Sequence, residues 1–113
     1  MKPLVATVAV LVSLAAGAPV QAQTPELDEL RARAEEGDAF AQNLLGLRYQ
    51  FGAGVPEDDT EAARWYRLAA DQGDTRAQFT VGDMYDNGDG VPKDFAEAAR
   101  WYRLAAGSRS TAT

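Results

Sequence analysis

The sequence predicts an all-α protein built as a short stack of helix pairs, and three observations support this. Segment 37–70 recurs as segment 73–106 at an offset of 36 residues without a gap, and 21 of the 34 aligned positions are identical. A repeat period of about 20–50 residues is typical of solenoids and related arrays. Within each copy, two segments with apolar residues at helical spacing flank a turn rich in Gly and containing Pro.

The composition excludes several functional classes. The chain has 113 residues, enough for one small domain, and it contains neither Cys nor His. Disulfides, thiolate chemistry and Cys-based metal sites are therefore excluded, and so is an imidazole base. The net charge of −6 argues against nucleic acid and against an anionic membrane surface as partners, because both are bound by basic faces.

Residues 1–22 have the features of a secretory signal peptide. Lys2 provides a positive start, and the 13 residues Leu4 to Ala16 are all apolar or small. The run ends before Gly17, and small residues stand at Val20-Gln21-Ala22, where a signal peptidase would read them. A membrane-spanning helix needs about 20 apolar residues, so an uncleaved anchor is disfavoured. We expect cleavage after Ala22, a periplasmic or secreted protein, and no membrane insertion after cleavage.

Segment 23–37 is predicted to form an N-terminal half-repeat helix that covers one end of the stack. Thr24 is a fair N-cap, and Pro25 suits the first helical position. This helix occupies the place of the second helix of a preceding repeat, as terminal repeats are often atypical. Its apolar residues at helical spacing are Leu27, Leu30 and Ala34.

Repeat one spans 38–72 and repeat two spans 73–106, each as helix, turn and helix. The first helices are expected over 39–51 and 75–87, with Asp38 and Asp74 as N-caps. The second helices follow Asp58 and Asp94, each placed three residues before a Glu as in a capping box. The small, polar segment 107–113 is predicted to be a disordered tail.

A glycine recurs in the middle of each first helix, at Gly46 and Gly82. Gly inside a helix costs about 1 kcal/mol relative to Ala, so its recurrence indicates a helix crossing too close for a side chain. In the turns, Pro56 and Pro92 force Val55 and Val91 into extended conformations, which would direct both valines between the two helices.

The pattern shared by the copies resembles the Sel-one-like repeat, a relative of the tetratricopeptide repeat. The residues that carry the resemblance run from Ala41 through Gly46, Tyr49, Gly52, Gly54 and Asp58 to Trp65-Tyr66 and Ala69-Ala70, and again 36 residues later. The resemblance implies a right-handed α-solenoid in which the first helices line the concave side. It also implies a scaffold for protein complexes, often in exported bacterial proteins.

Chemical functions are disfavoured by the residues present. Gly52-x-Gly54 lacks the third Gly, the strand and the helix N-terminus of a dinucleotide loop. Asp83, Asp86, Asp89 and Asp94 lack calcium-loop spacing, which leaves a solvated acidic face. After signal cleavage the remaining serines lie in the tail, at Ser108 and Ser110. We therefore expect no enzyme activity, no cofactor and no metal site.

The candidate partner-binding residues lie on the first helix of each repeat, where the copies differ. Framework positions are constant between copies, whereas positions at spacing 3, 4, 3 vary and fall on one helical face. Phe40, Phe79 and Arg76 are the expected anchors, because aromatic residues and Arg dominate interface hot spots. Packing of both phenylalanines against the neighbouring helix is the alternative. The full predicted face is Phe40, Asn43, Leu47 and Gln50 with Arg76, Phe79, Asp83 and Asp86.

The C-terminal end of the stack is a second candidate interaction surface. No third repeat follows residue 106 in this sequence. Open stack ends associate unless they carry a polar face, so we expect weak pairing with a second copy, or with a helix of a partner, through Trp101, Leu104 and Ala105.

The sequence thus predicts an exported, non-catalytic protein–protein interaction module of the bacterial cell envelope, acting as an adaptor or scaffold. The alternative is an envelope protein that binds glycan or cell-wall fragments with weak hydrolytic activity. Paired acids with aromatic residues on the concave face would favour the alternative. Mixed polar and apolar residues there favour a protein or peptide partner.

Overall fold

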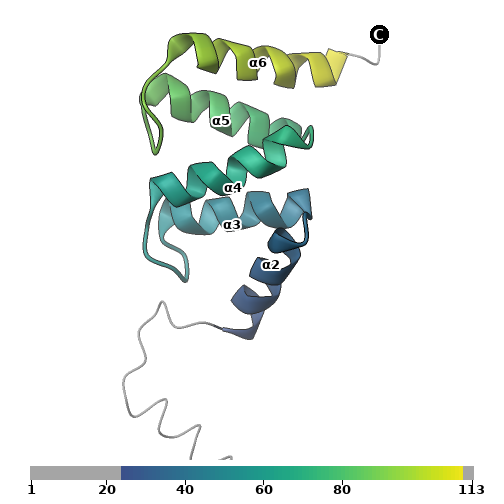
Figure 1. The fold of residues 1–113 in the computed structure, drawn as a ribbon, viewed down its shortest axis with the longest axis vertical. Helices are drawn as coiled ribbons and strands as arrows, with labels where there is room; N and C mark the ends of the chain where they lie inside the picture. The colour runs from purple at the N-terminus through teal and green to yellow at the C-terminus, as the bar shows by residue number, and fades with distance from the viewer. Residues whose placement is uncertain (1–23, 111–113) are drawn as a thin grey trace, which may run out of the picture.

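The computed structural model describes residues 24–110, which form a ladder of five helices (Figure 1). They are α2 (Pro25–Glu35), α3 (Ala39–Phe51), α4 (Asp59–Asp71), α5 (Thr75–Asn87) and α6 (Phe95–Ser110), with no strand among the described residues. The predicted signal peptide, residues 1–22, lies outside this range. None of the described helices is both long enough and apolar enough to span a membrane.

Each helix packs on its neighbours in the chain, and packing is most extensive within the pairs α3–α4 and α5–α6. The pairs α3–α4 and α5–α6 form successive layers of the stack, and α2 lies against α3 as a single helix (Figure 1). This is the arrangement of an α-solenoid, and it confirms the predicted fold of two helix-turn-helix repeats preceded by a half-repeat helix.

Aspartate side chains begin the repeat helices, as predicted. The Oδ1 atom of Asp38 accepts a hydrogen bond from the backbone of Ala41 at 3.1 Å, and Asp74 repeats this with Ala77 at 2.9 Å. The second helices begin in the same way at Asp58 and Asp94. Each such cap stabilises its helix by about 1 kcal/mol.

The reciprocal half of the predicted capping box does not form. The backbone N–H of Asp58 donates instead to the carbonyl of Tyr49 at 2.8 Å, and Glu61 forms an ion pair with Arg64 at 2.6 Å. Repeat two makes the equivalent bond from Asp94 to the carbonyl of Tyr85. The prediction is wrong here because the end of the preceding helix already satisfies the N–H that the glutamate would have bound.

The glycines in the first helices allow close crossing, as predicted. A Cβ atom added at Gly46 would lie 2.9 Å from the ring of Tyr66, and one at Gly82 would lie 2.7 Å from the ring of Tyr102. Contacts this short do not occur between real side chains, so the tyrosine rings of the second helices rest directly on backbone.

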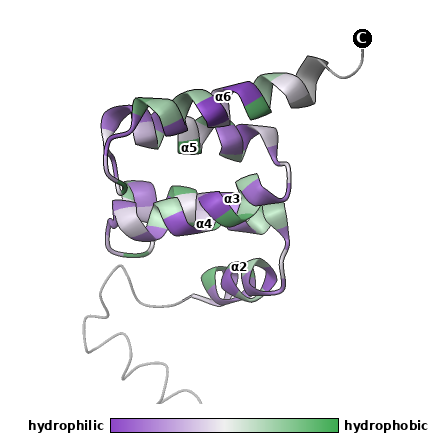
Figure 2. Cartoon of the chain, turned by 45° about the horizontal axis from the view of Figure 1, so that its top comes forward, coloured by the Kyte–Doolittle hydropathy of each residue, from purple (hydrophilic) through white to green (hydrophobic). Residues whose placement is uncertain are grey.

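The core consists of two clusters, one for each junction between successive repeats. Leu27 of α2 packs with Leu45 and Trp65 in the first cluster, and Trp101 joins Tyr66 and its alanine neighbours in the second. Apolar and polar residues alternate along every helix because each helix has a buried side and a solvent side (Figure 2). The predicted extended turns also place Val55 in the core and Val91 at its edge.

The helix α6 continues to Ser110. The prediction of a disordered tail starting at residue 107 is therefore wrong for 107–110, since the last helix extends past the end of the sequence repeat. Residues 111–113 lie outside the described range.

Candidate interaction groove

A groove of about 340 Å³ lies on the face formed by the first helices of the two repeats. Residues from α3 and α5 form its sides, and Tyr66 of α4 reaches it from below. Four residues of the predicted binding face meet here although they come from different repeats. The lining residues are Asn43, Leu47, Tyr66, Arg76, Phe79 and Thr80.

The edge of the groove carries two exposed aromatic rings and a cation. The Phe40 side chain is 56% exposed and that of Phe79 is 38% exposed. The guanidinium of Arg76 lies 5.9 Å from the centre of the Phe40 ring, within cation–π range. The Phe79 ring lies 6.1 Å from that of Tyr102 at a tilt of 48°. Both phenylalanines therefore make a neighbour contact and still expose surface that a partner can cover.

The wall formed by α3 combines a polar and an apolar residue. Asn43 is only 6% exposed, and its Oδ1 atom has no hydrogen-bond partner among the residues that the structure describes. A buried acceptor without a partner carries a desolvation cost of about 1–3 kcal/mol. Leu47 is 39% exposed. The groove therefore has an apolar surface at Leu47 beside a buried amide at Asn43.

The other predicted face residues lie beyond the groove lining. The Oε1 atom of Gln50 accepts a hydrogen bond from the hydroxyl of Tyr66 at 2.6 Å. Asp83 accepts one from the hydroxyl of Tyr102, and Asp86 is half-buried. Gln50 and Asp83 thus hold the tyrosines of the second helices in position.

These contacts change the acidity of both tyrosines. The hydrogen bond to Asp83, with smaller contributions from burial and from the charges of Asp83 and Asp86, raises the pKa of Tyr102 to about 12. Burial and the charge of Asp59 raise the pKa of Tyr66 further above its ordinary value. Both phenols therefore stay protonated donors across the physiological pH range.

Two groove residues were not in the predicted face, Tyr66 and Thr80. Tyr66 has an identical counterpart in the other copy, Tyr102, and this identity indicates a framework role. Identity between copies gives no sign that Tyr66 also lines the groove. The hydroxyl of Thr80 donates to the carbonyl of Arg76 at 3.0 Å. Repeat one has the apolar Leu44 where repeat two has the short, polar Thr80, and this difference between the copies was the available signal.

The predicted stack-end surface requires a correction. Trp101 is 3% exposed because it packs in the cluster formed by residues of α4 and α5, and Ala105 is fully buried. Leu104 is 42% exposed. A different side of α6 is uncovered. In α4, this side is buried where α5 follows, through Ala63, Tyr66 and Ala70. The equivalent residues of α6 are more exposed, and they are Ala99, Tyr102 and Ala106.

Within residues 24–110, no group of three or more acidic side chains gathers in a way that could hold a metal ion. Asp83, one of the four aspartates considered for calcium, is engaged by Tyr102. The arrangement of the groove is suited to contacts with another macromolecule through stacking, apolar contact and hydrogen bonding.

Comparisons with known proteins agree with the repeat architecture. The family model described as Sel1 repeat matches residues 39–74 and 75–108. No curated protein matches the chain. A protective antigen of uropathogenic Escherichia coli that displays an SLR fold is 48% identical, with a TM-score of 0.69, over 71% of this chain and 17% of the antigen.

Two further solved structures are similar. A Sel1 repeat protein from Oxalobacter formigenes is 39% identical, with a TM-score of 0.61, over 74% of this chain and 31% of that protein. Cysteine rich protein B of Helicobacter pylori is 24% identical, with a TM-score of 0.73, over 88% of this chain and 75% of that protein, and supports the fold alone. The chain thus spans less than a third of the length of the first two.

Proposed function

Since the chain belongs to the Sel1 repeat family, whose two matched copies cover residues 39–108, we propose that it is an exported protein–protein interaction module of the bacterial cell envelope. It acts as an adaptor that binds a segment of a protein partner in the groove between α3 and α5. The signal-like residues 1–22 support export, and the stacked-repeat fold supports a scaffold role.

One observation carries the proposal for the groove. Asn43, Leu47, Arg76 and Phe79 differ from their counterparts in the other repeat, and they nevertheless line a single hollow. Most framework residues that build the fold are constant between copies, and three of these four changed positions, Leu47, Arg76 and Phe79, have exposed side chains. Their convergence on one solvent-accessible groove is what selection for a ligand would produce.

The chemistry of the groove favours a peptide over a glycan. Its lining mixes an amide acceptor, an apolar side chain, a guanidinium and an aromatic ring. The paired acids Asp83 and Asp86, which would favour glycan binding with weak hydrolysis, lie outside this lining. A peptide supplies apolar side chains for the exposed surfaces of Leu47 and Phe79 and carboxylates or carbonyl oxygens for the guanidinium of Arg76.

The test is capture of partners from an envelope fraction with residues 23–113 as bait. Arg76→Ala and Phe79→Ala should reduce the yield of a specific partner at least tenfold while leaving the melting temperature nearly unchanged, because both side chains are exposed. Matched controls are Arg33→Ala and Phe51→Ala, which remove the same residue types at exposed sites outside the groove. Capture that ignores the groove variants would reject this site, and unfolding by either would assign them to the core.

We also propose weak self-association through the open side of α6, now defined by Ala99, Tyr102 and Ala106. The equivalent side of α4 is buried by α5, so a helix of a second copy has a template for docking there. Light scattering coupled to size exclusion across a concentration series should show an increase in mass that Ala99→Glu abolishes. A constant monomer mass for the wild type would reject self-association.

A further inference from the structure

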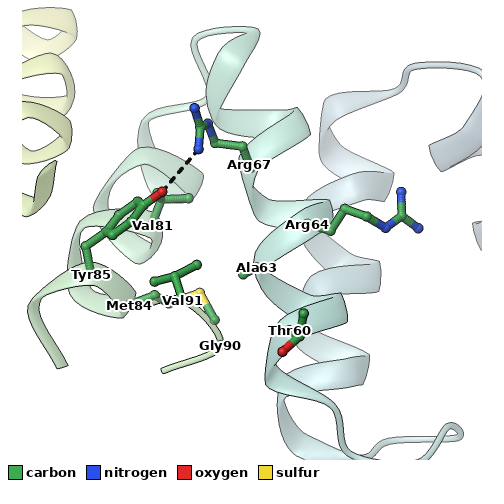
Figure 3. A pocket seen from close by; sticks show the side chains of 9 residues that line it. All are labelled: Thr60, Ala63, Arg64, Arg67, Val81, Met84, Tyr85, Gly90 and Val91. Carbon is green, nitrogen blue, oxygen red and sulfur yellow. Dashed lines mark hydrogen bonds between the residues drawn. The ribbon is translucent and has the colours of Figure 1, made fainter. Parts of the chain in front are cut away.

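A second hollow, of about 240 Å³, lies between α4 and α5 and shares no lining residue with the groove (Figure 3). Its inner surface is apolar, with Ala63 on the α4 side facing Val81 and Met84 of α5. The turn that follows α5 closes one end of this pocket through Gly90 and Val91.

The pocket has a counterpart one repeat earlier, between α2 and α3, and there the space is filled. Leu27 stands 36 positions before Ala63, and Leu45 stands 36 positions before Val81. Leu27 is 2% exposed and Leu45 is fully buried, and both pack with Val55 in one cluster. Two smaller residues at the second junction therefore leave open the volume that two leucines occupy at the first.

Exposure of the remaining wall supports this comparison. Val55, beside Leu27, is 5% exposed, whereas its counterpart Val91 is only partly buried. Because Ala63 stands where the first junction has Leu27, part of the apolar surface of Val91 is uncovered. An apolar cavity of about 150 Å³ is enough to hold a benzene molecule, so this pocket has room for the side chain of a leucine.

The pocket walls are fixed before any ligand arrives. A Cβ atom at Gly90 would lie 2.2 Å from the carbonyl oxygen of Asp59, so the turn rests on the backbone at the start of α4. At the mouth, Arg67 donates to the hydroxyl of Tyr85 at 3.3 Å (Figure 3). Arg67 also forms an ion pair with Asp71 at 3.5 Å. An apolar floor with a polar rim is the usual anatomy of a protein interface.

We propose that this pocket binds a leucine-sized apolar side chain of a protein partner, which takes the place that Leu27 fills at the preceding junction. The inference rests on the proposed function as an interaction module, but it concerns a different surface. The occupant is specified by the first junction of the same molecule, where a leucyl side chain fits between equivalent helices.

The test uses N-acetyl-leucinamide as the probe and the mature chain, residues 23–113, as the protein. Methyl resonances of Ala63, Val81, Met84 and Val91 are followed by ¹H–¹³C NMR during titration. We expect saturable shifts confined to these methyls, with N-acetylglycinamide producing none at equal concentration. Weak binding is expected, since a single side chain contributes only part of an interface.

The decisive variant is Ala63→Leu, which restores the residue of the first junction. It should weaken probe binding at least tenfold, since burial of one leucyl side chain corresponds to about that factor. The matched control is Ala32→Leu, the same change at an exposed position of α2 outside the pocket lining. This control should leave probe binding unchanged.

Val81→Leu narrows the pocket from the α5 side and provides a second blocking variant if Ala63→Leu does not fold. Absence of saturable shifts in the wild type, or equal binding by wild type and both blocking variants, would overturn the proposal. Shifts of the same methyls with protein concentration alone would identify a second copy as occupant and would also overturn it. Partner capture through the groove tests the proposed function separately, since Ala63→Leu leaves Arg76 and Phe79 in place.

Discussion

Replacement of Gly46 by Ala tests the close crossing of α3 and α4 on which each repeat depends. The substitution gains about 1 kcal/mol of helix propensity. It also places a Cβ atom 2.9 Å from two ring carbons of Tyr66, and overpacking of this kind costs about 1–3 kcal/mol. Tyr66 is 1% exposed and its hydroxyl is held by Gln50 at 2.6 Å, so the ring has no room to retreat.

The same substitution at Gly82 provides a comparison within one molecule. The ring of Tyr102 lies closer, at 2.7 Å, but this tyrosine is only half-buried, because no helix follows α6 among the described residues. The hydroxyl of Tyr102 is bonded to Asp83, but this carboxylate belongs to an exposed side chain, so the ring and the carboxylate can move outward together. We expect Gly82→Ala to be nearly neutral, whereas Gly46→Ala lowers the free energy of unfolding by up to about 2 kcal/mol.

Urea denaturation followed by far-ultraviolet circular dichroism measures both free energies of unfolding. The variants carry the same chemical change at aligned positions, so differences in helix propensity cancel. A Gly46→Ala variant as stable as Gly82→Ala would refute the reasoning, since it would show that the buried tyrosine ring moves as freely as the exposed one.

Three further predictions concern export, the core and pH. Intact-mass measurement of the exported protein should find Gln23 as its first residue, and a membrane-held product retaining Met1 would contradict this. Trp65→Ala should lower the free energy of unfolding, measured by urea denaturation, by about 3–5 kcal/mol. The Phe51 side chain is 70% exposed, so Phe51→Ala should change this free energy by less than about 0.5 kcal/mol. Similar losses in the two variants would contradict the assigned core. Because the pKa of Tyr102 is raised from 10.0 to about 12, its contribution to stability is complete below pH 10 and is lost as the pH rises toward 12. Unfolding measured from pH 8 to 12 should show this decrease in the wild type, and an equal decrease in Tyr102→Phe would contradict the assignment.

The helices and their starting residues could be predicted from the sequence because they depend on neighbours in the chain. Asp38 accepts from a backbone N–H three residues away, and the period of 36 residues identified equivalent helices. The capping box failed because it depends on a distant group, the carbonyl of Tyr49, which takes the N–H of Asp58.

The candidate groove was predicted in part. Of the residues selected by variation between the copies, four line one groove, since residues on one face of equivalent helices align in a stack; they are Asn43, Leu47, Arg76 and Phe79. Variation could not select Tyr66, because a residue that is constant for packing can also line a groove. It also could not show that Asp83 is occupied by Tyr102, a contact between helices.

By itself, the sequence determined the helices, the repeat and the order of the helices in the stack. The reason is that caps, helical periodicity and a repeat period act within short stretches of chain. The tertiary structure alone decided which sides of α6 are covered and where space remains between layers. The absence of a following repeat led to the prediction that Trp101 and Ala105 are exposed. Both are buried, since burial depends on which helix lies opposite. The pocket beside Ala63 likewise depends on tertiary structure. It exists because α4 and α5 meet through Ala63 and Val81, which are smaller than the two leucines at the equivalent positions of α2 and α3.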